Sequence, residues 1–116
     1  MDLIIEILTR RGVALIRCTG RIVFGSEAEF LCKQLDNVFA QSPKCILNLG
    51  GVRQIDARGL GMLISCYREA RAKGRSLILT NVSETVRDLL RITRLLDVLK
   101  ICPSEEAALG ACGQSA

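Results

Sequence analysis

Short runs of aliphatic residues alternate with amphipathic stretches along the chain. Residues 3–8 and 13–19 are β-type runs separated by a basic, glycine-containing turn, and this pattern predicts a hairpin. Further strands are expected at 45–49, 77–80 and 98–101, because these runs are short, apolar and bounded by turn residues. Residues 20–25 are expected to form a connector, in which residues 22–23 can form a short extended piece, and residues 48–51 are expected to lead into a turn.

Apolar positions that recur three and four residues apart predict the helices. The first helix is expected to begin at Ser26, where Ser26 and Glu29 form a capping-box pattern, and to stop near residue 42. The second is expected over residues 57–73, ending before Gly74. The third is expected to start at Ser83, and a short last helix to open at residues 103–106.

The predicted order β-β-α-β-α-β-α-β-α is typical of a single α/β domain. Crossovers between successive strands through helices require parallel neighbours, so we expect one mixed, mostly parallel sheet with an antiparallel hairpin at its N-terminal side. The domain is expected to occupy residues 1–112, followed by a loose tail at 113–116.

Composition limits the class of protein. The chain has 116 residues, of which 49% are hydrophobic and only 3% aromatic, so we expect one domain with an aliphatic core. The net charge of +4 comes from mixed charges without a dense basic run, which argues against a nucleic-acid partner. The acidic N-terminus does not resemble a signal peptide, and no apolar run is long enough to span a bilayer. We therefore expect a cytoplasmic protein without a membrane partner.

The chain has six cysteines and no histidine. No two cysteines form a C-x-x-C pair, so no metal site or cofactor is expected. Most cysteines lie among aliphatic residues, and we expect reduced thiols in the core. Without histidine there is no obvious nucleophile–base pair, and an enzymatic function is not expected.

The stretch "RQIDARGLGML" carries the candidate chemistry. Asp56 can cap the second helix by accepting from the N–H of Arg58 or Gly59, worth about 1 kcal/mol. Gly59 and Gly61 either allow close packing of the helix start on the sheet or leave a flat surface for a partner. Arg58 is either a solvated cation or a fixed charge that selects an acidic partner, with Arg53 adding to it.

The longer segment "CILNLGGVRQIDARGLGMLISCYREARAKGRSLIL" resembles the centre of a STAS domain, the fold of anti-sigma-factor antagonists and of the cytoplasmic tails of sulfate transporters. "VRDLLRITRLLDVLKICPSEEAAL" is similar to the end of that domain, and "GRIVFG" to the connector of one bacterial subgroup. In the family, the segment from Asp56 to Gly61 usually reads Asp-Ser-Ser-Gly-Leu-Gly.

The resemblance implies a comparison with members in which a partner kinase phosphorylates the first serine of that motif. Ala57 stands at the position of this serine. Ala57 has no hydroxyl group, so no phosphorylation is expected there, and Arg58 replaces the second serine. Val23 stands where some members carry an acidic residue that helps to engage the kinase. The usual phosphorylation switch is therefore not expected in this chain.

The resemblance therefore implies a non-enzymatic regulatory module that binds an anti-sigma factor of the Ser-kinase type, or a related signalling protein, and so releases a sigma factor. A scaffold subunit of a signalling assembly, including a homodimer, is the alternative. We expect the partner to contact the connector at residues 20–25 and the residues Gln54, Asp56, Ala57, Arg58, Gly59, Leu60 and Gly61.

Overall fold

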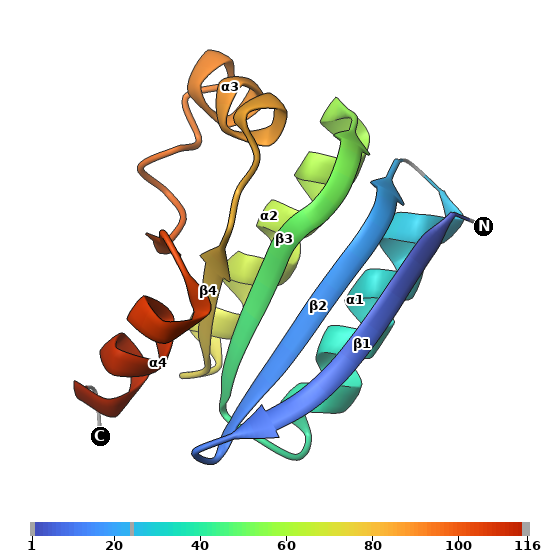
Figure 1. Cartoon of the computed structure of the whole chain (residues 1–116). Helices are drawn as coiled ribbons and strands as arrows, with labels where there is room; N and C mark the ends of the chain where they lie inside the picture. Colours follow the sequence, from blue (N-terminus) through green and yellow to red (C-terminus); the bar gives the residue numbers. More distant parts are fainter. Residues whose placement is uncertain (1, 24, 115–116) are drawn as a thin grey trace.

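The computed structural model describes residues 2–23 and 25–114. Figure 1 shows the elements in the predicted order, which is confirmed. Their bounds are β1 Leu3–Arg10, β2 Val13–Ile22, α1 Ser26–Phe39, β3 Lys44–Ile55, α2 Ala57–Ala72, β4 Ser76–Thr80, α3 Glu84–Ile92, β5 Ile101–Cys102 and α4 Glu105–Gln114.

The strands form a mixed sheet in the order β1-β2-β3-β4-β5. β1 pairs antiparallel with β2, from Leu3 opposite Gly20 to Arg10 opposite Val13. The remaining neighbours are parallel, because each pair is joined by a helical crossover. The expected mixed α/β sheet with an N-terminal hairpin is thus confirmed.

Helices cover both faces of the sheet. α1 and α2 lie behind the sheet in the view of Figure 1, and α4 lies in front of it. The larger core fills the α1/α2 side, where α3 adds Val86 and Leu90. A smaller cluster under α4 joins Leu15, Ile46 and Ile78 of the sheet to Leu109. The central strands are therefore buried on both faces and nearly continuously apolar, as parallel strands usually are.

β2 and β3 are longer than the sequence pattern predicted. The expected connector at residues 20–25 is wrong in its first part, because β2 runs to Ile22, and the expected turn at residues 48–51 is wrong, because β3 continues through Gly50 and Gly51. At Gly51 the glycine reflects close backbone approach rather than a turn. A Cβ on Gly51 would lie 2.7 Å from the carbonyl oxygen of Cys18 on the neighbouring strand.

The start of α1 differs from the starts of α3 and α4. The capping box at α1 does not form: Gly25 is the N-cap residue, and the hydroxyl of Ser26 donates to Glu27 instead. The caps at Ser83 and Ser104 do form, since their hydroxyls accept from the N–H groups of Val86 and Ala107.

The C-terminal part differs from the prediction in its bounds. The last strand is β5 at Ile101–Cys102 rather than residues 98–101, and α4 includes positions 113 and 114 of the expected tail. Residues 115 and 116 of that tail lie outside the described residues. The division into a domain and a tail stays a prediction.

A polar cluster fastens α4 to the sheet. The Nε and Nη2 atoms of Arg17 donate to the two carboxylate oxygens of Glu105 at 2.9 and 3.0 Å, and Nδ2 of Asn48 donates to Glu105 at 2.7 Å. Arg17 and Asn48 are cross-strand neighbours on β2 and β3. The hydrogen bond from Arg17, more than the one from Asn48, holds the pKa of the Glu105 carboxyl below its ordinary value.

Candidate functional site

The start of α2 follows directly from the end of β3. Asp56 has extended backbone angles and is the N-cap, as predicted; its Oδ1 accepts from the N–H of Gly59 at 2.7 Å. The carbonyl of Asp56 also accepts from the N–H of Leu60 at 2.9 Å. No acidic residue lies in the first turn of α2, so Asp56 supplies the negative charge at the positive end of the helix dipole.

The two glycines of the motif have different surroundings. A Cβ on Gly59 would lie 2.4 Å from the carbonyl oxygen of Ile22, so this glycine lets the first turn of α2 touch the end of β2. A Cβ on Gly61 would meet nothing within 4 Å. Gly59 therefore allows close packing of the helix start, as one alternative predicted. Gly61 leaves the helix surface open, and its contact with a partner stays a prediction.

The predicted partner-binding residues divide into an exposed and a buried group. Leu60 is only 1% exposed and packs in the core, and Gly59 is buried under β2. The side chain of Leu60 therefore has a structural position rather than one that a partner can reach. The residues that remain accessible, called here the α2-start surface, are Gln54, Asp56, Ala57, Arg58 and Gly61.

The connector at residues 20–25 is partly buried, and Arg53 is engaged in an ion pair. Within residues 20–25, Gly20 and Ile22 are buried, and position 24 lies outside the described residues. The guanidinium of Arg53 forms an ion pair with Asp2, which also lies 3.1 Å from Nε of Arg21. The charge of Arg53 is thus partly compensated at the sheet edge.

A groove runs between α1 and α2 and begins at the α2-start surface. Its volume is about 630 Å³. Its α1 side carries Cys32 and Asp36, and its α2 side carries Arg58, Gly61, Met62, Ser65, Cys66 and Glu69. Arg58 lies at one end of the groove, and Glu69 and Asp36 lie towards the other. The cation and the two carboxylates therefore flank a mostly apolar middle.

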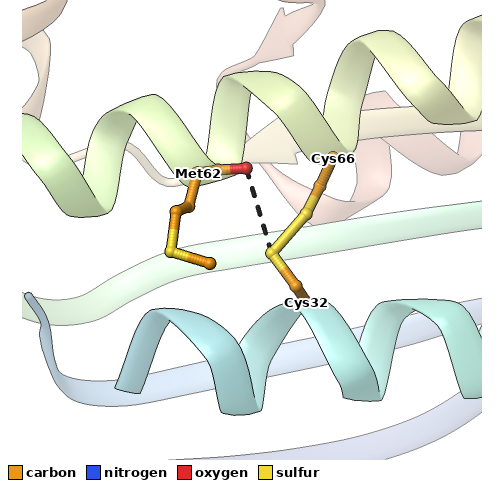
Figure 2. The surroundings of a disulfide bond; sticks show 3 residues. All are labelled: Cys32, Met62 and Cys66. Atoms are coloured by element: carbon orange, nitrogen blue, oxygen red, sulfur yellow. Dashed lines mark hydrogen bonds between the residues drawn. A yellow bond between two sulfur atoms is a disulfide. The ribbon is translucent and has the colours of Figure 1, made fainter. Parts of the chain in front are cut away.

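A disulfide bond crosses this groove. Cys32 of α1 and Cys66 of α2 are bonded, with their Cα atoms 6.4 Å apart, as Figure 2 shows. The expectation of reduced thiols throughout is therefore wrong for this pair. The two cysteines are separated by 34 positions, so no C-x-x-C spacing predicted this disulfide. Only the packing of α1 on α2 brings the two residues together.

The remaining cysteines match the expected core thiols more closely. Cys18, Cys45 and Cys112 are buried and Cys102 is half-buried, all with free thiols. Burial raises the pKa of Cys18 and of Cys45 to about 12, so these thiols stay protonated at neutral pH. Among the described residues, no cluster of His, Cys, Asp or Glu could hold a metal ion.

Comparison with known families identifies the domain. The family model of the STAS domain matches residues 5–108. The chain belongs to the STAS domain family. Within residues 2–23 and 25–114, no helix combines the length and apolar character needed to cross a membrane.

Solved structures share this fold at low sequence identity. An anti-sigma factor antagonist from Mycobacterium paratuberculosis is 20% identical with a TM-score of 0.81, over 95% of this chain and 93% of that chain. The Bacillus cell fate determinant SpoIIAA in its phosphorylated form is 20% identical with a TM-score of 0.69, over 94% and 99% of the two chains. A sulfate transporter family protein from Wolinella succinogenes is 24% identical with a TM-score of 0.77, over 92% and 89%. At these identities, the similarity concerns the fold of this STAS domain.

Proposed function

We propose that this STAS domain is a non-enzymatic, cytoplasmic regulator of the anti-sigma-factor antagonist type. Its partner is an anti-sigma factor of the Ser-kinase type or a related signalling protein, and binding releases a sigma factor. Family membership supports the regulatory class, and the relatives described as anti-sigma factor antagonists support the kind of partner.

The observation that carries the proposal is the exposed Ala57 at the first position of α2. The STAS resemblance assigns the phosphorylated serine to this position. A phosphate there would add a charge of about −1.5 to −2 at the interface. Because Ala57 cannot accept it, phosphorylation at this position cannot change the charge of the α2-start surface, and we infer that it does not switch binding off.

Arg58 adds a specificity element. It is exposed next to Ala57 and lines the groove between α1 and α2. A fixed cation favours a partner with an acidic patch and disfavours one with a basic patch. This difference would direct the domain to a partner other than that of members with a serine at this position.

The test compares two exposed alanines in the first turns of different helices. Ala57→Glu adds a negative charge to the α2-start surface, whereas Ala107→Glu adds one at the exposed start of α4, on the opposite face of the sheet. We expect Ala57→Glu to weaken binding to the purified Ser-kinase-type anti-sigma factors of the same genome, measured by calorimetry. Ala107→Glu should bind like the unmodified protein; equal binding by all three proteins would exclude the α2-start surface as the interface.

A scaffold role is the second candidate, and the edge strand β1 favours it. Among the residues that the structure describes, β1 has a strand neighbour on one side only, and Ile4 on it is 71% exposed. Open strand edges with apolar side chains can pair with a second copy. Light scattering of the protein and of Ile4→Lys tests this role: a dimer that dissociates in the variant supports it, and a monomer at all concentrations refutes it.

A further inference from the structure

The Cys32–Cys66 pair differs from the other cysteines in position. Both residues are half-buried and line the groove between α1 and α2, whereas Cys18, Cys45 and Cys112 are buried. A small thiol or disulfide reagent can therefore reach this pair from the groove.

The disulfide and the α2-start surface share one face of α2. Arg58, Met62, Cys66 and Glu69 recur at the spacing that places side chains on one side of a helix, and all of them line the groove. With a rise of about 1.5 Å per residue, the disulfide lies about 12 Å along the axis from Arg58. A standard interface covers about 800 Å² on each partner, so a protein bound to the α2-start surface also covers the disulfide.

We propose that the Cys32–Cys66 pair is a redox switch that controls partner binding at the α2-start surface, in place of the missing phosphorylation at Ala57. This inference rests on the proposed function of that surface. The oxidised form is the tight-binding form, because the cross-link holds α1 against α2 and fixes the groove before the partner arrives. Reduction frees the two helices to shift and the partner then has to order them.

The oxidant is a low-molecular-weight disulfide of the glutathione class. One cysteine, as the thiolate, attacks this disulfide to form a mixed disulfide and releases one small thiol. The second cysteine then attacks the mixed disulfide, so the Cys32–Cys66 bond forms and a second small thiol leaves. The protein loses two electrons, the small disulfide gains them, and the two cysteine protons end on the released thiols.

Reduction reverses these steps and leaves a well-placed thiol. Sγ of Cys32 lies 3.9 Å from the carbonyl oxygen of Met62, as the dashed line in Figure 2 marks. Once the disulfide is reduced, the Cys32 thiol on α1 can donate to this carbonyl oxygen on the neighbouring helix α2. This acceptor gives the reduced thiol a polar partner, although the covalent link that holds α1 against α2 is gone.

The experiment titrates the pair in buffers of reduced and oxidised glutathione and measures partner affinity in the same buffers. Mass spectrometry of the linked peptide gives the oxidised fraction, and calorimetry with the anti-sigma factors gives the affinity. We expect binding to weaken about tenfold as the pair is reduced. Cys102→Ser should respond like the unmodified protein, whereas Cys66→Ser should bind weakly at every glutathione ratio.

Each outcome decides a separate point. Redox-dependent binding that Cys66→Ser abolishes supports the switch. Equal affinity of the oxidised and reduced protein, or failure of the disulfide to form even in oxidised glutathione, overturns it while the proposed function stands. If no anti-sigma factor binds in either state, the proposed function fails and the switch with it. Phosphine reduction of the unmodified protein provides a reduced form without a substitution, should Cys66→Ser fold poorly.

Discussion

The opposite surroundings of Gly59 and Gly61 predict opposite effects of the same substitution on stability. Alanine is favoured over glycine inside a helix by up to about 1 kcal/mol, because it restricts the unfolded chain. Gly61→Ala should realise this gain, since its Cβ meets nothing within 4 Å. We expect the free energy of unfolding to rise by about 0.5–1 kcal/mol.

Gly59→Ala should lower the free energy of unfolding instead. Its Cβ would lie 2.4 Å from the carbonyl oxygen of Ile22 and 3.1 Å from the carbonyl carbon. Both atoms are backbone at the end of β2, so no side chain can rotate away, and α2 or the strand must move. Overpacking costs about 1–3 kcal/mol. This cost exceeds the propensity gain, and we expect a net loss of about 1–2 kcal/mol, or about 4–8 °C in Tm.

Urea unfolding followed by far-UV circular dichroism measures both variants, because the chain has no tryptophan to report unfolding by fluorescence. Both proteins should be compared under the same redox conditions so that the disulfide does not differ. A Gly59→Ala protein as stable as the unmodified one would refute the close approach of α2 to β2. Losses of equal size in both variants would show that the helix start needs glycine for another reason.

Further changes test the cap, the disulfide and the fastening of α4. Asp56→Ala should lower the free energy of unfolding by about 1 kcal/mol in urea titrations, because the N–H of Gly59 loses its acceptor. Reducing the Cys32–Cys66 bond should lower it by about 2–4 kcal/mol in the chain-entropy account, since the bond joins residues 34 positions apart. The pKa of Glu105 is lowered in the fold, so the stability that its carboxylate adds is complete above the ordinary carboxyl pKa and is lost as the pH falls through the lower folded pKa. Thermal melts across this acidic range should show a shallower decline for Glu105→Gln than for the unmodified protein.

Matched controls define the outcomes that would contradict these expectations. Asp56→Asn keeps an acceptor oxygen and should retain most of the stability, so a loss as large as that of Asp56→Ala would speak against capping. An unfolding midpoint unchanged by reduction would show that the cross-link adds nothing to the fold.

The candidate site was predictable as far as it depends on neighbours in sequence. Asp56 precedes an apolar-periodic stretch, and its cap forms within the first turn of α2. The motif also located Ala57 and Arg58 at an exposed helix start. The roles of Gly59 and Gly61 could not be separated in advance, because the separating contact is with Ile22 on another element.

The order of strands and helices, the antiparallel hairpin and the position of α2 follow from the sequence by itself, because hydrophobic period and capping residues act over a few neighbouring positions. The tertiary structure alone decided that β3 continues through Gly50 and Gly51. At Gly51 the neighbouring strand β2 leaves no room for a side chain. It also decided that Cys32 meets Cys66, and that Arg17 holds Glu105 across 88 positions. These contacts form only when helices and strands pack on one another. The spacing of residues along the chain does not show which residues from different elements will meet.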